Sequence, residues 1–151
     1  MLKSLQTAIM TRYNSVDGAT LRGLVQGLYE DEAPSSVALQ TQAGENLPNV
    51  EIKPIVVFSI VTTGLDDQNF CSDFFSPLVQ FVIYGDANNK SSIDLLTICK
   101  ELISLYANEL LTMDDGYEMI RVDTVEQRKF KDIDKMWNVI VEMQYIVQKD
   151  R

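Results

Sequence analysis

A long run of alternating apolar residues near the end of the chain constrains the fold most. From Met136 to Val147 every second residue is apolar: Trp137, Val139, Val141, Met143, Tyr145 and Val147. Successive side chains of a β-strand point to opposite faces of the sheet, so this period of two predicts a strand with one face against a core. Tyr117 to Phe130 contains a similar alternation. The short link between the two runs predicts an antiparallel hairpin.

The middle of the chain contains two further candidate strands. Ile55 to Thr63 is a β-branched run, and Leu78 to Tyr84 is the next one. The polar, acidic connection from Leu65 to Asp73 suggests that these strands are also antiparallel neighbours. A shorter strand is expected to end near Tyr29, after a short helical turn that begins at about residue 19.

Two segments have the spacing of amphipathic helices. Leu2 to Tyr13 places apolar residues at intervals of three and four, and the run Asn14 to Gly18 is a stop signal. Ser91 and Asp94 form a capping pair at the start of a longer helix. Its expected apolar face consists of Leu95, Leu96, Cys99, Leu102, Ile103, Tyr106 and Leu110. Asp114, Asp115 and Gly116 are expected to end this helix.

This order of elements predicts an α+β fold. We expect a mostly antiparallel sheet of four or five strands, with the N-terminal helix and one long helix packed on it. The 151 residues fit one domain, 1–151. The segment 35–53 is expected to be an insertion-like loop region, in which Val37 to Thr41 could form a short strand.

Charge and cysteine content exclude several classes of protein. The 22 acidic and 13 basic residues give a net charge of −9, which argues against gripping nucleic acid or docking on anionic lipid. We expect no membrane association, because the longest apolar stretch, Ile55 to Val61, is too short to span a bilayer. Cys71 and Cys99 are expected to be reduced, largely buried thiols, which suits a reducing compartment such as a cytoplasm.

The sequence offers little support for catalysis. It has no histidine, which removes the usual general base and the commonest zinc ligand. The carboxylate clusters at 30–32, 66–67 and 114–115 lack the alternating ligand spacing of a calcium loop, so we interpret them as solvated. We therefore expect no enzyme activity, catalytic residue, cofactor or metal site. A small carboxylate-based ligand-binding or enzymatic domain stays open as an alternative.

A cluster of aromatic residues lies in the acidic connection between the two middle strands. Phe70, Phe74 and Phe75 occur close to Asp66 and Asp67 in a segment expected to be a loop. They either fold back on the core as a lid or anchor a partner subunit, since aromatic residues are enriched at the centres of interfaces. Trp137 belongs to the alternating apolar face of the last strand, so we expect it to pack in the core.

The charges are distributed unevenly along the chain. Residues 30–89 contain nine acids and one base, whereas residues 121–135 contain five bases and four acids. The simple interpretation is separate solvated faces, and the alternative is a subunit with unlike surfaces that packs head to tail. The candidate subunit or partner interface therefore contains, besides the residues of the acidic connection, Arg128, Lys129 and Lys131.

Four segments in this order resemble the tail terminator, or tail-completion, proteins of long-tailed bacteriophages. They are the helix MLKSLQTAIMTRY at the start, Gly27-Leu28-Tyr29 followed by Ala33-Pro34, the strand led by Pro54, and Ile83-Tyr84-Gly85-Asp86 followed by a helix and two closing strands. The sequence departs from the family at 35–53, where the family passes quickly to the proline-led strand.

The resemblance implies a structural virion protein. It implies a homohexameric ring that caps the tail tube, ends tube polymerisation and joins the tail to the head-completion or connector proteins. DNA would pass through the channel without specific binding. The protein would be located at the head–tail junction of the virion, and in the host cytoplasm during assembly. Another phage neck, head-completion or tube-like protein is the alternative within the same class.

Overall fold

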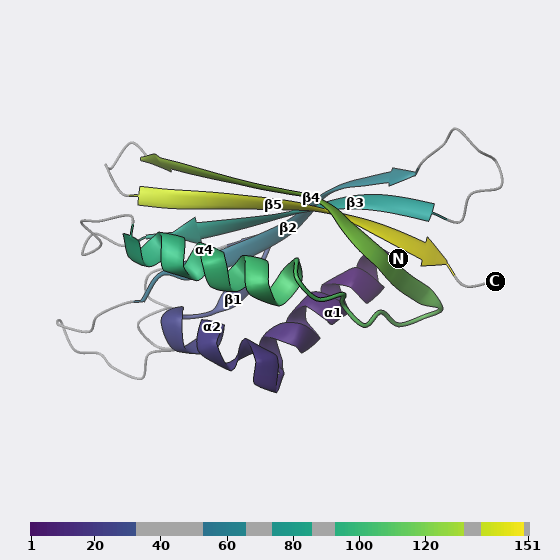
Figure 1. The fold of residues 1–151 in the computed structure, drawn as a ribbon, viewed down its shortest axis with the longest axis horizontal. Coiled ribbons are helices and arrows are strands. Elements are labelled where there is room, and N and C mark those ends of the chain that lie inside the picture. The colour runs from purple at the N-terminus through teal and green to yellow at the C-terminus, as the bar shows by residue number, and fades with distance from the viewer. Residues whose placement is uncertain (33–52, 66–73, 86–92, 132–136, 150–151) are drawn as a thin grey trace.

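The computed structural model describes residues 1–32, 53–65, 74–85, 93–131 and 137–149. They form an α+β fold in which the helices α1, α2 and α4 all lie on the same side of one twisted sheet (Figure 1). This confirms the predicted fold class. The predicted short strand at Val37 to Thr41 and nearly all of the insertion-like segment 35–53 lie outside the described residues.

Within the described residues, the sheet has five strands in the order β1-β2-β3-β5-β4. β1 pairs in parallel with β2, and the other three pairings are antiparallel. The predicted β2–β3 and β4–β5 pairs are thereby confirmed. The strand bounds are β1 Leu28–Glu30, β2 Ile55–Leu65, β3 Phe74–Tyr84, β4 Tyr117–Lys131 and β5 Trp137–Lys149.

β3 begins earlier than the predicted start at Leu78. It starts at Phe74, and it includes Pro77, which pairs with Thr63 of β2. The pairing of β3 with β5 passes from Phe75 directly to Leu78. Proline has no N–H to give to a ladder, so its presence argues against a central strand. Here the sheet accommodates it where pairing with β5 is interrupted.

In the part of the chain that the structure describes, the helices α1, α2 and α4 cover the inner face of the sheet. α1 spans Leu2–Asn14, and after the 3-10 turn η1, Val16–Gly18, the short helix α2 spans Ala19–Leu24. Gly18 is buried, and a Cβ atom at this position would lie 2.1 Å from the carbonyl oxygen of Tyr13. The stop signal after α1 therefore requires a residue without a side chain.

The long helix α4 is shorter than predicted. It spans Ile93–Tyr106, and the amides of Ala107 and Asn108 both donate to the carbonyl of Ile103 at its end. Leu110 is therefore not on the helix and is 49 % exposed, whereas Leu111 is buried. The expected role of Asp114 to Gly116 as the helix end is wrong.

The segment after α4 is held instead by a long-range contact with α1. The buried Ser4 hydroxyl donates to the Asp114 carbonyl at 2.9 Å and accepts from the Asp114 amide at 2.8 Å. Asp115 and Gly116 then adopt positive φ angles of 58° and 75°, which makes the turn that starts β4. A contact between residues this far apart in sequence cannot be seen from local spacing.

The core lies between the helices and the inner face of the sheet. The predicted alternation of β5 is confirmed, because Val139, Val141, Met143, Tyr145 and Val147 are fully buried. The Tyr145 hydroxyl donates to the carbonyl of Tyr106 at 3.0 Å, and the Tyr106 hydroxyl donates to that of Ile9 at 3.0 Å. This chain of contacts joins β5, α4 and α1, and burial raises the pKa of both phenols.

Candidate assembly interface

Those candidate interface residues that the structure describes lie at opposite ends of the sheet. Phe74 pairs with Gln148 at one end of β5, while Lys131 pairs with Trp137 at the other end. These two β5 positions are eleven residue steps apart, which is roughly 36 Å at the rise of a strand. Figure 1 shows the same separation, with the start of β3 at one end of the molecule and the end of β4 at the other. The candidates therefore form two separate sets.

Two of the three residues in the aromatic set, Phe74 and Phe75, lie on the strand β3, which corrects the loop predicted for them. Phe74 is 41 % exposed, whereas Phe75 packs against the core and meets the Tyr117 ring edge-on, with 6.0 Å between centroids. Neighbouring residues of a strand face opposite sides, so one ring joins the core and the other stays at the surface. Asp66, Asp67 and Phe70 lie outside the described residues.

The basic set surrounds a tryptophan at the far end of β4. The ammonium groups of Lys129 and Lys131 lie 5.3 and 4.7 Å from the centroid of the Trp137 ring. Residues two apart on a strand share a face, and Lys131 pairs directly with Trp137, which brings the three side chains together. Trp137 packs against the core, as expected from its place on the apolar face of β5, but it is half-buried and lies at the margin of the core.

The third base of this set has a different partner. The Arg128 guanidinium pairs with the carboxylate of Glu142 at 2.8 Å, and Gln80 donates to the same oxygen at 3.0 Å. Its charge is thus largely balanced by a residue of the same chain. Lys129 and Lys131 have no carboxylate partner among the described residues.

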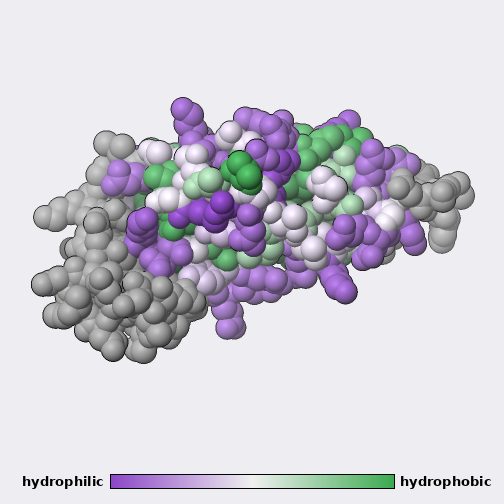
Figure 2. Space-filling model, turned by 90° about the horizontal axis from the view of Figure 1, so that it is seen from below, coloured by the Kyte–Doolittle hydropathy of each residue, from purple (hydrophilic) through white to green (hydrophobic). Residues whose placement is uncertain are grey.

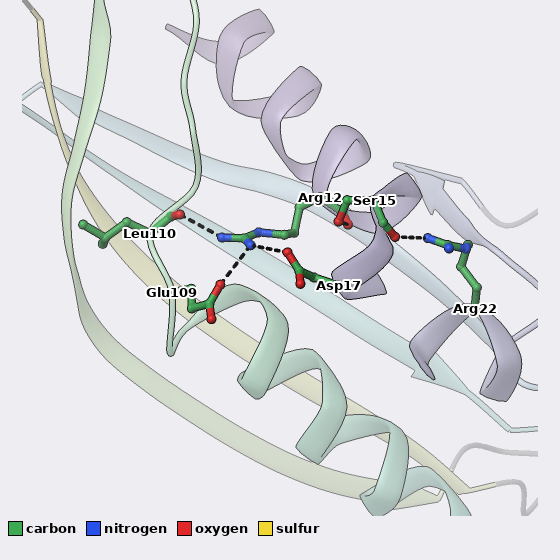
Figure 3. A network of polar contacts seen from close by, with 6 residues as sticks. All are labelled: Arg12, Ser15, Asp17, Arg22, Glu109 and Leu110. Atoms are coloured by element: carbon green, nitrogen blue, oxygen red, sulfur yellow. Dashed lines mark hydrogen bonds and ion pairs between the residues drawn. The ribbon is translucent and has the colours of Figure 1, made fainter. Parts of the chain in front are cut away.

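A polar network on the helical side was not predicted from the sequence. Arg12 donates to Asp17 at 3.2 Å, to Glu109 at 3.0 Å and to the Leu110 carbonyl at 2.9 Å (Figure 3). Its side chain is 16 % exposed, whereas both carboxylates are mostly exposed. Arg12 therefore ties the end of α1 to the segment that follows α4.

A second arginine closes the turn between α1 and α2. Arg22 donates to the Ser15 carbonyl at 2.6 Å and also to the carbonyl of Tyr13. The Ser15 hydroxyl donates to the Arg12 carbonyl at 2.7 Å. A small open pocket of about 160 Å³ lies beside this network, lined by Ala8, Thr11, Arg12, Ser15, Asp17 and Thr112. These contacts satisfy the carbonyl groups at the end of α1, which is a structural role.

The described residues contain neither a cluster of metal ligands nor an exposed thiol. Within them no three His, Cys, Asp or Glu side chains come together in a metal-binding arrangement. Cys99 is a free, buried thiol that donates to the side-chain oxygen of Gln127 at 2.9 Å, and burial raises the pKa of this thiol. Cys71 lies outside the described residues.

The helical side of the molecule is predominantly hydrophilic. Figure 2 shows this face covered mainly by hydrophilic residues, with hydrophobic residues gathered in limited areas. None of the helices among the described residues is long and apolar enough to cross a membrane.

Comparison with known proteins finds a shared fold and no sequence family. No protein-family model matches the sequence, and no curated protein matches it. Fourteen chains of solved structures match the structure. One belongs to a structure described as "Virion of native gene transfer agent (GTA) particle", with a TM-score of 0.63 and 12 % identity. The match covers 97 % of this chain and 96 % of that chain, so the two share their fold from end to end.

Proposed function

We propose that this chain is a structural virion protein that acts as a tail terminator. The observation that carries the proposal is the end-to-end likeness to a chain of a gene transfer agent virion particle, at a TM-score of 0.63. It agrees with the resemblance of the four sequence segments to the tail-terminator family. In this role the protein forms a homohexameric ring at the head–tail junction, caps the tail tube and ends its polymerisation.

The proposed mechanism is binding, with no bond made or broken. One surface of the ring binds the tail tube protein, and the other binds the head-completion or connector proteins. The separation of the aromatic set from the basic set supports this role, because a subunit with unlike ends can contact unlike neighbours. The net charge of −9 suits a ring through which DNA passes without adhering to it.

A second candidate is another neck, head-completion or tube-like component of the same kind of particle. The matching chain is described only as part of a virion particle. The likeness in fold therefore does not distinguish a tail terminator from other components of such a particle. Both candidates predict a ring, and they differ in whether the ring stops the growth of a tube.

Electron microscopy of the purified protein, combined with native mass measurement, tests the proposal. We expect closed rings with the mass of six subunits, either alone or on the ends of isolated tail tubes. In a tube assembly assay, adding the protein should limit tube length. A protein that stays monomeric in the presence of tubes, and leaves their length unchanged, would rule out the terminator role. Rings that polymerise into tubes would favour the second candidate.

A further inference from the structure

The two edge strands of the described sheet carry opposite charges at nearby positions along the strand direction. The strand pairings align Leu28 of β1 with Val56, Ile83 and Val139, and finally with Lys129 of β4. β1 and the basic end of β4 therefore lie at the same level, separated by the width of five strands. That width is about 19 Å at the usual strand spacing.

The β1 edge is acidic. Glu30 ends β1, and Asp31 and Glu32 follow it, so three exposed carboxylates occur in succession. Asp31 has a φ of 61°, and the Glu32 amide donates to the Glu30 carbonyl at 2.7 Å, which makes a tight turn at this edge. Glu30 accepts a hydrogen bond from Gln6. None of the three carboxylates forms an ion pair with another described residue.

The β4 edge is basic at its end, and no described strand other than β5 pairs with it. β4 is the last strand of the sheet, so one row of its backbone N–H and C=O groups faces away from β5. The exposed Lys129 and Lys131 lie in the last three residues of the strand. Trp137 holds both ammonium groups in place by cation–π contacts, which reduces the side-chain freedom lost on binding.

We propose that the β4 edge of one copy docks against the β1 edge of a second copy. Lys129 and Lys131 then meet the carboxylates of Glu30, Asp31 and Glu32. Each subunit uses a different edge for each neighbour, so the contact is heterologous and repeats from copy to copy. β4 is antiparallel to β1 within the sheet, so copies placed side by side bring these edges together in antiparallel orientation.

The strand register also predicts that the two copies are offset from each other along the strand direction. Glu30 lies level with Gln127, through Phe58, Phe81 and Val141. A shift of about four residues, or roughly 13 Å, moves Glu30 and Glu32 opposite the two lysines. The same shift moves Asp31 away from the exposed Glu126, which a level arrangement would bring close.

A second copy fits the basic edge better than nucleic acid does. A phosphate backbone that extends beyond the two lysines along β4 meets Glu126, and Glu142 lies beside Arg128. A short acidic turn can contact the lysines without reaching these carboxylates. The whole chain also carries a net charge of −9, which opposes a long polyanion.

Charge reversal on each edge tests the contact in the full-length protein. The basic-edge variant is K129E/K131E, and the acidic-edge variant is E30K/E32K. Arg128 is left unchanged because it pairs with Glu142, and Asp31 because of its positive φ. We expect each variant alone to weaken self-association by about tenfold or more. The combination of all four substitutions in one chain should restore it, because both edges are then reversed.

Sedimentation velocity and electron microscopy measure the assembly, and thermal unfolding followed by circular dichroism shows that each variant is folded. R121E is the matched control, since Arg121 lies near the other end of β4 in an exposed pair with Asp123. It should assemble like the wild type. If K129E/K131E is poorly folded, K129Q/K131Q replaces it. This neutral variant should also weaken association, but less than the charge reversal does.

The inference rests on the proposed self-assembly, but the two can fail separately. Rings that neither reversal weakens would overturn the edge contact and leave the proposed ring intact. Four substitutions that do not restore association would also overturn the contact. Restored association in the form of open chains without rings would support the contact and contradict the proposed ring. A wild type that does not self-associate at any concentration, either alone or in the presence of tail tubes, contradicts both.

Discussion

At the scale of single residues, close backbone approach decides the identity of Gly18. The residue has ordinary backbone angles, φ −80° and ψ −2°, so positive φ does not explain the glycine. The carbonyl oxygens at the end of α1 explain it, because they occupy the space of a Cβ atom. By contrast, Gly116 has φ 75° and open space around it, so its requirement is conformational.

We therefore predict that Gly18→Ala destabilises the protein by about 1–3 kcal/mol, the usual cost of forcing a methyl group into packed space. Gly23→Ala is the control. Gly23 lies in α2 and a Cβ there would meet nothing within 4 Å, so alanine should be neutral or stabilising by up to about 1 kcal/mol. Urea denaturation measures both. Equal stability of the two variants would contradict the steric explanation.

At the scale of elements, side chains of α1 form hydrogen bonds that hold the segment between α4 and β4. Ser4 holds the turn before β4, and Arg12 holds the segment that follows α4. The N-terminal helix thus organises a connection that the sequence pattern assigned to the end of α4. α1 is expected to stabilise this connection as well as the core.

Replacement of Arg12 tests the role of α1. Arg12→Gln removes the guanidinium from the Leu110 carbonyl and from two carboxylates, and we expect a loss of about 1–2 kcal/mol in the free energy of unfolding. Arg121→Gln is the matched control. It breaks an exposed pair with Asp123, which should contribute less than about 0.5 kcal/mol. Chemical denaturation of both variants checks the difference, and a similar loss in each would refute the prediction.

At the scale of the whole molecule, the layers are held together by tyrosines that stay neutral. Tyr106 and Tyr145 connect two helices to the sheet, and the Tyr106 ring also stacks on Phe81, with 5.0 Å between centroids. Burial raises the pKa of both phenols above the ordinary value of 10.0. Both buried hydroxyl groups thus need their protons for the fold to be stable.

Stability should consequently fall at alkaline pH. Above pH 10 the unfolded chain releases phenol protons that the folded protein retains, so the free energy of unfolding decreases as pH rises. The slope approaches about 1.4 kcal/mol per pH unit for each of the two tyrosines, and this contribution is fully present below pH 10. Urea denaturation at pH 8 to 11 checks it, with tyrosinate absorbance as a second signal. Unchanged stability up to pH 11 would contradict the assignment.

Local patterns in the sequence were sufficient to predict the type of each long element. Side-chain alternation is a local property, so it predicted β4, β5 and the buried face of β5. Helical spacing and the stop signal predicted α1 in the same way. The basic set was also visible in the sequence as a local excess of Arg128, Lys129 and Lys131, although its contacts with Trp137 and Glu142 were not.

The ends of the elements, and the residues that come together, depend instead on tertiary contacts. The start of β3 at Phe74, before Pro77, depends on an interruption in the pairing with β5 that local spacing does not show. The end of α4 depends on packing of the following segment, and the partners of Arg12 come from the distant residues Glu109 and Leu110. Strand order placed the acidic and basic edges on opposite sides of one sheet. Local patterns encode periodicity, whereas these features depend on contacts between segments remote in sequence.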